Sequence, residues 1–455
     1  MTRTDPTDVP RPDATLHFGV FFGGPKLGAA PGSGPPSSWR AHWTVWTLPQ
    51  GAPPLDPMTF RHTAELAERG MFDAFFLPEG LRLREVDGAI QDLEMAGRPD
   101  AITQLCALAA HTKHIGLVTT SNTTFSEPAD LARRLSGLDL LSAGRAGWNV
   151  VTSDSAWIGE NFRRGGYLDH ADRYRRAEEF LAVCRELWDS WPDDALSPSR
   201  DAPSWSRRDA IGRVRYRGQH IDVDARATLP RSPQGHPVIY QAGASSSGRD
   251  FAARNADVIF SPFGTDFDAA FDFAQDVRSR LRTAGRSADD VRIMPGVEVI
   301  IGATPKEAEE KARWVRTQQI TPALALQMAG ALWGMDLSDR DPDGPLPPEE
   351  PAAVRNQEHV AEWRALAERH RWSLRDTAIH LGPRTDHVGT PAQLADRFVH
   401  FARHGAVDGF NFNPYMIPDG LDDIVELLVP ELQERGAYRS AYTTTTLRGH
   451  LGLGE

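Results

Sequence analysis

A strand-like run that leads into small and hydroxylated residues is the first feature that could do chemistry. The segment from Val238 to Arg249 reads VIYQAGASSSGR. Small residues let backbone N–H groups approach a ligand, serine hydroxyls add donors, and a helix N-terminus favours an anion. Ser245 and Ser246 are therefore candidate phosphate ligands. The same residues would also make an ordinary serine N-cap with a tight turn, and the segment alone leaves both interpretations open.

A second polar cluster ends the segment RAGWNVVTS, from Arg145 to Ser153. Asn149, Thr152 and Ser153 stand where a strand should end, and their side chains could hydrogen-bond the edge of a polar heterocycle. The alternative is a strand end that satisfies its own backbone, as short polar side chains often do.

His170 and Tyr174 lie four residues apart at the start of a predicted helix capped by Asp169. Residues at this spacing share one helix face, so both side chains point the same way. Both could donate a hydrogen bond to a phosphate or a ring carbonyl. They could equally be packing residues whose polar tips remain in water.

Polar residues also follow two earlier strand-like runs. Glu79 comes after the apolar run that ends in Leu77, and the hydroxyl-rich stretch Thr119–Thr123 ends the next run. His42 lies among Trp39, Trp43 and Trp46 in a long loop that could line an apolar substrate pocket or simply anchor itself.

The elements that must position these residues alternate between short apolar runs and amphipathic helical patterns, which is typical of parallel strands joined by crossover helices. Strands are expected at Leu16–Phe22, Phe72–Leu77, Ile115–Ser121, Trp148–Thr152, Pro237–Ala242, Asp257–Pro262, Val291–Ile301 and Asp408–Asn413. Eight strands, each followed by a helix, predict an α/β fold of the (β/α)₈ TIM-barrel type, a single domain over residues 1–455. The polar ends of strands 2 to 5 then converge on one mouth.

Three stretches are longer than the connections of a minimal barrel and are expected to be insertions. They cover residues of about 25–54 after strand 1, 192–235 before strand 5 and 337–390 before strand 8. Among the helices, one is expected to run from Thr304 to Gly334. An open doubly wound sheet is the alternative fold, but its glycine-rich dinucleotide turn is missing after the first strand.

Composition narrows the function classes. The 455 residues carry 50 Lys and Arg against 62 Asp and Glu, a net charge of −12, which argues against nucleic acid and anionic membranes as partners. No apolar stretch reaches the roughly 20 residues of a membrane helix, and the polar N-terminus does not look like a secretory signal. With only two cysteines and no His-Glu-x-x-His pattern, we expect a cytoplasmic protein with no metal site.

Several longer motifs resemble the bacterial luciferase-like flavin monooxygenases. They are HFG from His17, AELAERGMFD from Ala64, and the run from Thr112 to Ser153, within which SAGRAGWNVVTS is the most specific part. More narrowly, the chain is similar to the branch of nitrilotriacetate, dibenzothiophene-sulfone, dimethyl sulfide and long-chain alkane monooxygenases. The likeness extends over most of the chain outside the insertions.

The resemblance implies a two-component FMN-dependent monooxygenase. Such an enzyme takes reduced FMN from a separate NAD(P)H:flavin reductase and reacts it with O₂. The resulting flavin C4a-(hydro)peroxide oxygenates a small organic substrate. Members of the family are commonly homodimers or homotetramers.

Carried over position by position, the resemblance makes Glu79 an acid near the flavin, where the family usually has Asp, and Thr119 a hydroxyl on the third strand. His170 with Tyr174, and Ser245 with Ser246, match the family's His-x-x-x-Tyr pair and phosphate-binding serines. His42 and His170 are candidate catalytic residues that would donate a proton or steady the peroxide. The FMN-binding residues are expected to be Glu79, Thr119, Asn149, His170, Tyr174, Ser245 and Ser246.

Two positions depart from the family pattern. Ala129 follows Pro128 where an aromatic residue is usual, and the sequence NFRR from Asn161 replaces Asn-Phe-Gly in a loop that borders the substrate. No known substrate is therefore transferred. Two other hypotheses stay open, namely an F420-dependent reductase or dehydrogenase of the same superfamily and a flavin-binding protein without turnover. A barrel hydrolase would need paired carboxylates or a metal cluster, and Glu79 is the one acid suitably placed.

Overall fold

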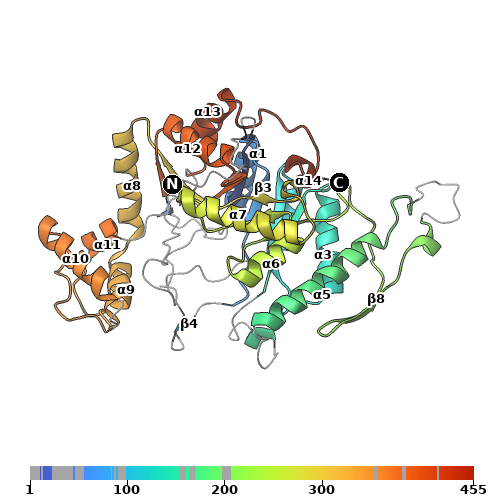
Figure 1. The fold of residues 1–455 in the computed structure, drawn as a ribbon, viewed down its shortest axis with the longest axis horizontal. Coiled ribbons are helices and arrows are strands. Elements are labelled where there is room, and N and C mark those ends of the chain that lie inside the picture. Colours follow the sequence, from blue (N-terminus) through green and yellow to red (C-terminus); the bar gives the residue numbers. More distant parts are fainter. Residues whose placement is uncertain are drawn as a thin grey trace.

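The computed structural model describes residues 11, 14–22, 45–46, 56–82, 85–86, 89–90, 99–152, 159–162, 170–196, 206–352, 356–381, 386–417 and 420–454. Its centre is a parallel sheet surrounded by helices (Figure 1). The strand order is β12-β11-β10-β7-β6-β3-β1-β15-β13-β14. The strands are β1 (His17–Phe21), β3 (Ala74–Leu77), β6 (Gly116–Asn122), β7 (Ala146–Val151), β10 (Val238–Gln241), β11 (Val258–Ile259), β12 (Arg292–Ile293), β13 (Gly296–Ile301), β14 (Asp386–Gly389) and β15 (Gly409–Phe412).

The two pieces β12 and β13 belong to one predicted strand. Between them, the Met294 N–H donates to Ile259 O of β11 at 2.8 Å, while Pro295 O accepts from the Asn411 N–H of β15 at 2.8 Å. The strand order therefore returns to the segment in which it began, as an eight-stranded barrel requires. All eight predicted strands are confirmed, and the α/β fold class with them.

Helices surround the sheet, and several of them begin at aspartate caps. Asp56 accepts a hydrogen bond from the Met58 N–H at 3.1 Å, and Asp100 accepts one from the Thr103 N–H at 2.8 Å. Pro57 and Pro128 occupy first turns, where a missing N–H costs nothing. These helices are α1 (Pro57–Arg69), α2 (Ala101–Ala109), α3 (Pro128–Leu141), α5 (His170–Asp189), α6 (Ser246–Asn255), α7 (Phe267–Thr283), α8 (Pro305–Gln319), α12 (Pro391–Arg403), α13 (Val429–Glu434) and α14 (Leu447–His450).

The prediction of one helix from Thr304 to Gly334 is wrong. Helix α8 ends at Gln319, and α9 (Pro322–Trp333) starts anew with the Thr321 side chain accepting from the Leu324 N–H. Pro322 removes a backbone donor and disfavours helical geometry in the residue before it, so the apolar pattern continues while the helix does not.

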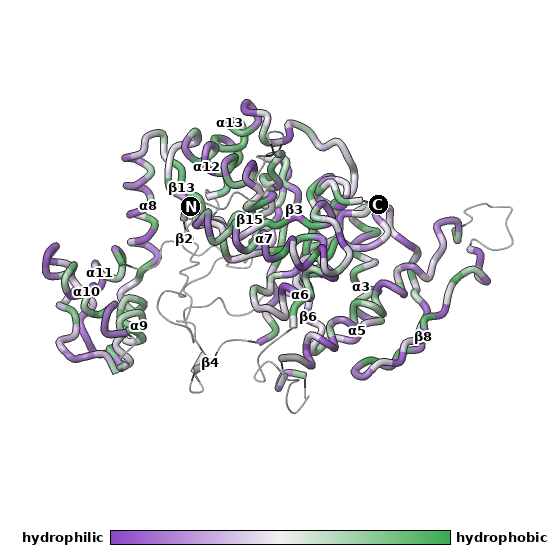
Figure 2. The backbone as a smooth tube through the Cα atoms, viewed as in Figure 1, coloured by the Kyte–Doolittle hydropathy of each residue, from purple (hydrophilic) through white to green (hydrophobic). Residues whose placement is uncertain are grey.

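The insertion before strand 8 builds a helical module beside the barrel. Helices α9, α10 (Gln357–His370) and α11 (Leu374–Leu381) pack around their own apolar cluster, which includes Trp333 and Trp363. The module extends from α8 to one side of the barrel (Figure 1), and its α9 is largely hydrophobic (Figure 2). The insertion ends in β14, a strand that pairs with β13 beyond the predicted eight.

The other insertions are only partly covered by the structure. The one before strand 5 contains an antiparallel hairpin of β8 (Val214–Arg217) and β9 (Asp222–Ala225). Of the stretch 25–54, the structure describes the backbone of β2 (Val45–Trp46), which pairs with β16 (Met416–Ile417). A further hairpin joins β4 (Glu85–Val86) and β5 (Ala89–Ile90).

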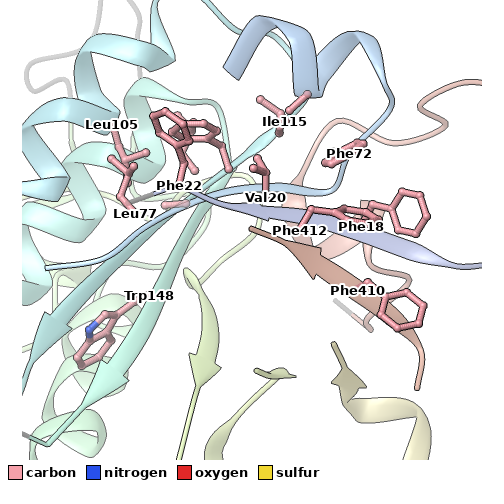
Figure 3. Close-up of a cluster of buried hydrophobic side chains, with 14 of the residues drawn as sticks. Phe18, Val20, Phe22, Phe72, Leu77, Leu105, Ile115, Trp148, Phe410 and Phe412 are labelled. Atoms are coloured by element: carbon pink, nitrogen blue, oxygen red, sulfur yellow. The ribbon is translucent and has the colours of Figure 1, made fainter. Parts of the chain in front are cut away.

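The core has two layers separated by the strands, because alternate side chains face opposite sides. The outer layer lies between strands and helices and includes Phe18, Phe410 and Phe412 on the adjacent strands β1 and β15 (Figure 3). The inner layer includes Phe76 and Tyr240, and Leu447 and Leu451 of the C-terminal segment join it. The C-terminal segment thus fills one end of the barrel interior with apolar side chains.

Within the parts of the chain that the structure describes, no helix combines the length and apolarity needed to cross a membrane.

Candidate active site at the C-terminal ends of the strands

Polar side chains replace apolar ones in the inner layer toward the C-terminal ends of the strands. Asn149 on β7 donates from Nδ2 to Thr120 Oγ1 on β6 at 3.2 Å. Asn411 on β15 alternates with two outward-facing phenylalanines, so it also faces inward. Asn149, Asn411 and Tyr240 are buried, and Asn149 Oδ1, Asn411 Oδ1 and Tyr240 Oη have no hydrogen-bond partner among the described residues.

An unpaired buried polar atom costs about 1–3 kcal/mol. Native proteins therefore pair such atoms with a ligand, water or another protein group. Asn149 Oδ1 is an acceptor that suits an N–H on a polar ring.

The turn after β10 is tightly built around two glycines. A Cβ atom placed on Gly248 would lie 2.9 Å from the Cα of Gly243, so the first turn of α6 packs directly against the strand end. A Cβ on Gly243 would lie 3.0 Å from the hydroxyl oxygen of Tyr174. The predicted residue Tyr174 therefore lies beside the predicted phosphate-binding turn, although 69 positions separate it from Gly243 in the numbering of the sequence.

Ser245 is the N-cap of α6. Its Oγ accepts from the Gly248 N–H at 3.1 Å, so the capping interpretation is confirmed. A serine hydroxyl keeps its own proton to donate, and Ser245 and Ser246 are both exposed. The cap therefore leaves hydroxyl groups and the positive end of a ten-residue helix available to an anion.

Salt bridges hold α6 against α7. Arg249 pairs with Asp276 at 2.7 Å, and Arg280 pairs with both Asp250 and Asp276. Arg280 Nη1 also lies 3.4 Å from Ser246 Oγ. This network fixes the start of α6, and with it the two serines.

Glu79 lies just beyond the end of β3, where the backbone register pairs Leu77 with Thr119. Asn122 Nδ2 donates to Glu79 Oε2 at 3.2 Å, and Asn122 Oδ1 accepts from the Phe125 N–H at 2.7 Å. Burial raises the pKa of Glu79 to about 7, although hydrogen bonds from Asn122 act in the opposite direction. Glu79 is thus a carboxyl group that can gain or lose a proton near neutral pH.

A short 3₁₀ helix, η2 (Glu160–Phe162), joins three of the rim loops. Asn161 Nδ2 donates to Leu81 O at 2.8 Å, and Glu160 forms an ion pair with Arg82. The Phe162 ring stacks on Phe125 with centroids 5.0 Å apart and planes 2° apart. Asn161 and Phe162, the two described residues of the unusual NFRR sequence, therefore contact the loops after β3 and β6.

The predicted site residues fall into three groups. Glu79, Asn149, Tyr174, Ser245 and Ser246 lie at or beside C-terminal strand ends. Thr119 is buried on β6, but strand alternation puts it on the side of the outward-facing Leu117, and its neighbour Thr120 contacts Asn149. His170 is the first residue of α5, with its side chain outside the described part, and His42 and Ser153 lie outside the described residues altogether.

Sequence reasoning missed several polar residues of this end. Asn122 was one of a polar run and had no assigned partner. Gln241, whose Oε1 accepts from the Gly243 N–H at 2.6 Å, looked like part of a buried strand. Asn411 could have been found from the alternation Phe410-Asn411-Phe412, which predicts an inward polar side chain.

As a chemical arrangement, the mouth offers a buried amide oxygen, a titratable carboxyl and a helix N-terminus with hydroxyl donors. These groups suit a polar ring joined to a phosphate. Among the described residues no three His, Cys, Asp or Glu side chains come together to bind a metal ion.

Comparison with known proteins agrees with this fold. Residues 41–408 match the family model described as luciferase-like monooxygenase. Nitrilotriacetate monooxygenase component A of Aminobacter aminovorans is 39% identical over 90% of this chain and 94% of its own. N-acetyl-S-(2-succino)cysteine monooxygenase of Bacillus subtilis (strain 168) is 38% identical over 87% of this chain and 89% of its own.

A solved structure of a long-chain alkane monooxygenase superposes with a TM-score of 0.77 at 30% identity, covering 96% of this chain and 95% of that one. The chain belongs to the luciferase-like monooxygenase family. It is therefore an oxidoreductase of the monooxygenase type, as the resemblance in its motifs predicts.

Proposed function

We propose that this protein is the oxygenase component of a two-component FMN-dependent monooxygenase. The observation that carries the proposal is the meeting of Tyr174 with the glycine turn and serine cap of α6, at the mouth that also holds Glu79 and Asn149. Reduced FMN would come from a separate NAD(P)H:flavin reductase. When bound, it supplies the activation of O₂ and the transfer of one oxygen atom to a small organic substrate.

The residues present fit this cofactor at both of its polar ends. At one end, the Ser245 and Ser246 hydroxyls, the Tyr174 hydroxyl and the start of α6 would hold a phosphate. At the other, the unpaired Asn149 Oδ1 would accept from a ring N–H, since a buried amide oxygen without a partner calls for a donor.

The protein's own contribution is to orient the flavin and to shield it from water. The narrow contact between Gly243 and Gly248 lets the backbone approach the phosphate closely, where larger residues would force the turn apart. The apolar inner layer below the site, closed by Leu447 and Leu451, excludes water from beneath the ring.

His170 stays in the proposal as a further flavin ligand, and His42 and His170 as proton donors. If replacing His42 with Asn leaves product formation per flavin oxidised unchanged, His42 has no such role. The oxygenase is further proposed to act as a homodimer or homotetramer, as the resemblance implies.

The test is an anaerobic titration of the purified protein with reduced FMN, followed by rapid mixing with oxygenated buffer and absorbance recording. We expect saturable binding of reduced FMN and a long-lived flavin transient whose decay a substrate accelerates. Binding of FMN without oxygenated product from any candidate substrate would indicate a flavin-binding protein. Binding of F420 in place of FMN would replace the proposed cofactor.

The same titration has a matched control within the site. Riboflavin lacks the phosphate, so Ser245→Gly should weaken FMN binding while leaving riboflavin binding unchanged. Gly keeps the N-cap geometry at a cost of only a few tenths of a kcal/mol, so the helix itself should remain.

A further inference from the structure

The flavin contacts proposed above lie on or beside one half of the barrel. Glu79 follows β3, Asn149 is on β7, and Ser245 follows β10. In the strand order these contacts belong to the consecutive strands β10, β7, β6 and β3. The other four strands of the barrel are β1, β15, the β12–β13 segment and β11. A substrate that reacts with the flavin must lie beside it, so this second half of the mouth is where a substrate would bind.

Two aromatic rings form the floor of the second half. Phe21 is the last residue of β1, and Phe260 directly follows β11. Their ring centroids lie 5.5 Å apart, although β15 and the β12–β13 segment separate β1 from β11. The two rings therefore meet inside the barrel. Both also contact Phe76, which is buried, whereas Phe21 and Phe260 are partly exposed and so form the upper surface of this aromatic group.

Asn413 lies beside Phe260 on the inner side of the strands. It directly follows β15, and Phe412 before it belongs to the outer layer, so strand alternation turns Asn413 inward. Gly296 of β13 also faces inward, since Val297 belongs to the outer layer. A Cβ atom on Gly296 would lie 2.6 Å from the Phe260 ring and 3.4 Å from Asn413 Nδ2. The ring and the amide therefore share the inner space that this glycine leaves.

The two asparagines on this side of the barrel are held in different ways. Asn411 is fully buried, its Nδ2 donates to Met294 O at 2.8 Å, and its Oδ1 would lie 2.2 Å from a Cβ atom on Gly19. Asn411 is therefore enclosed by the barrel itself. Asn413 is partly exposed, and its Oδ1 is a buried acceptor with no partner among the described residues. A donor is needed to complete it, because an unpaired buried acceptor is costly.

We propose that Asn413 is a specificity-determining residue that accepts a hydrogen bond from the substrate, while Phe21 and Phe260 hold the flat part of the same molecule. The substrate class is then an aromatic or unsaturated compound that bears an N–H or O–H group. Aromatic rings pack favourably against such a compound, and a buried acceptor rejects an analogue that lacks the donor. The inference rests on the proposed function, because it places the substrate beside a flavin. It adds a substrate class and a residue outside the predicted site.

The experiment measures the dissociation constants of indole and benzofuran by equilibrium dialysis, without FMN and with saturating FMN on both sides of the membrane. The two probes have the same bicyclic shape, but benzofuran has an oxygen where indole has its N–H. Indole should bind about tenfold more tightly, because it alone can donate to Asn413 Oδ1. FMN should leave this ratio unchanged, since the flavin occupies the other half of the mouth.

Substitutions separate the acceptor from the floor. Asn413→Leu removes the acceptor and keeps a similar volume, so indole affinity should fall about tenfold while benzofuran affinity does not fall. Asn413→Asp keeps an acceptor and should keep the preference for indole. Phe260→Leu changes the floor alone, so it should weaken both probes alike. Asn413→Ala serves if the leucine variant does not fold.

Gln327→Leu is the matched control, because it makes the same change from amide to alkyl group on the exposed face of α9 and should alter neither affinity. Equal affinities for the two probes, no binding of either, or equal losses in Asn413→Leu would overturn the inference. Displacement of the probes by FMN would also overturn it, because the probes would then occupy the flavin half. If reduced FMN binds, the proposed function stands in each of these cases. If reduced FMN does not bind the wild type, the proposed function fails whatever the probes show.

Discussion

Two carboxyl groups at opposite ends of β3 have pKa values shifted in opposite directions. Asp73 directly precedes the strand and Glu79 lies two residues past its last residue, Leu77. Burial raises the pKa of Asp73, but the charge of Arg439 and the contact with His17 outweigh it and hold the pKa at about 2. Burial raises the pKa of Glu79 to about 7, although hydrogen bonds from Asn122 act in the opposite direction.

The partners explain the difference. Asp73 forms an ion pair with Arg439, lies 3.2 Å from His17 Nδ1, and accepts from the Phe18 N–H at 2.8 Å. Asp73 is thus fully paired, while at the other end Asn149 Oδ1 has no partner among the described residues and the pKa of Glu79 is raised to about 7. Barrels commonly place stability at the first end and chemistry at the second.

The largest expected effect is a loss of stability when the Asp73–Arg439 ion pair is broken. Asp73→Asn leaves Arg439 buried without its carboxylate, and losing one partner of a buried pair costs about 3–5 kcal/mol. Urea unfolding at pH 7 measures the loss. Because the folded pKa is lowered, this stability is present above the ordinary value of 3.8 and is lost as the pH falls toward about 2.

The matched control is Asp130→Asn, which breaks an exposed pair with Arg133 at 2.8 Å. Exposed pairs contribute about 0–1 kcal/mol. If both substitutions cost the same, burial of the Asp73 pair would not be the source of its stabilisation.

A smaller effect is expected at the C-terminal ends of the strands. It should change FMN affinity more than the free energy of unfolding. Tyr174→Phe removes a hydroxyl beside the phosphate turn, and a hydrogen bond to a charged group contributes about 1.5–3 kcal/mol. FMN affinity should therefore fall about 10- to 100-fold, with riboflavin affinity and urea midpoint unchanged, in fluorescence titrations. Equal losses for FMN and riboflavin would place the hydroxyl away from the phosphate.

The smallest expected effect is on thermal stability, and its direction separates Glu79 from Asp73. Because the folded pKa of Glu79 is raised, its contribution to stability is present below the ordinary value of 4.5 and is lost as the pH rises through about 7. Glu79→Gln cannot ionise, so it should raise Tm by a few degrees at pH 8 and leave it unchanged at pH 4. Calorimetry at the two pH values checks this, and a lower Tm at pH 8 would contradict it.

Local patterns sufficed for much of the fold. Each strand-like run ends at a turn, a cap or a polar cluster. The eight strands could therefore be predicted from the alternation of apolar runs with helical patterns and from the residues that end each run. The helix break at Thr321 was missed because the apolar pattern runs through it. The strand β14 is four residues long and was hidden in an insertion.

The site could be predicted only in part, since its contacts depend on register. Glu79 and Asn122 meet because Leu77 pairs with Thr119 across β3 and β6, a relation between residues far apart in sequence. The pairing of Asp73 with Arg439 spans 366 positions and left no local signal. Ser245 and Tyr174 could be predicted because a helix start and a four-residue spacing are local features.

The most direct test of the contrast is carboxyl titration by ¹³C NMR in the ligand-free protein, with labelled Asp and Glu and with Glu79→Gln and Asp73→Asn for assignment. The account predicts a Glu79 resonance that titrates at about 7 and an Asp73 resonance that stays ionised down to about pH 3. A Glu79 resonance that titrates near the ordinary value of 4.5 would contradict it, because the two ends of β3 would then not differ as the structure indicates.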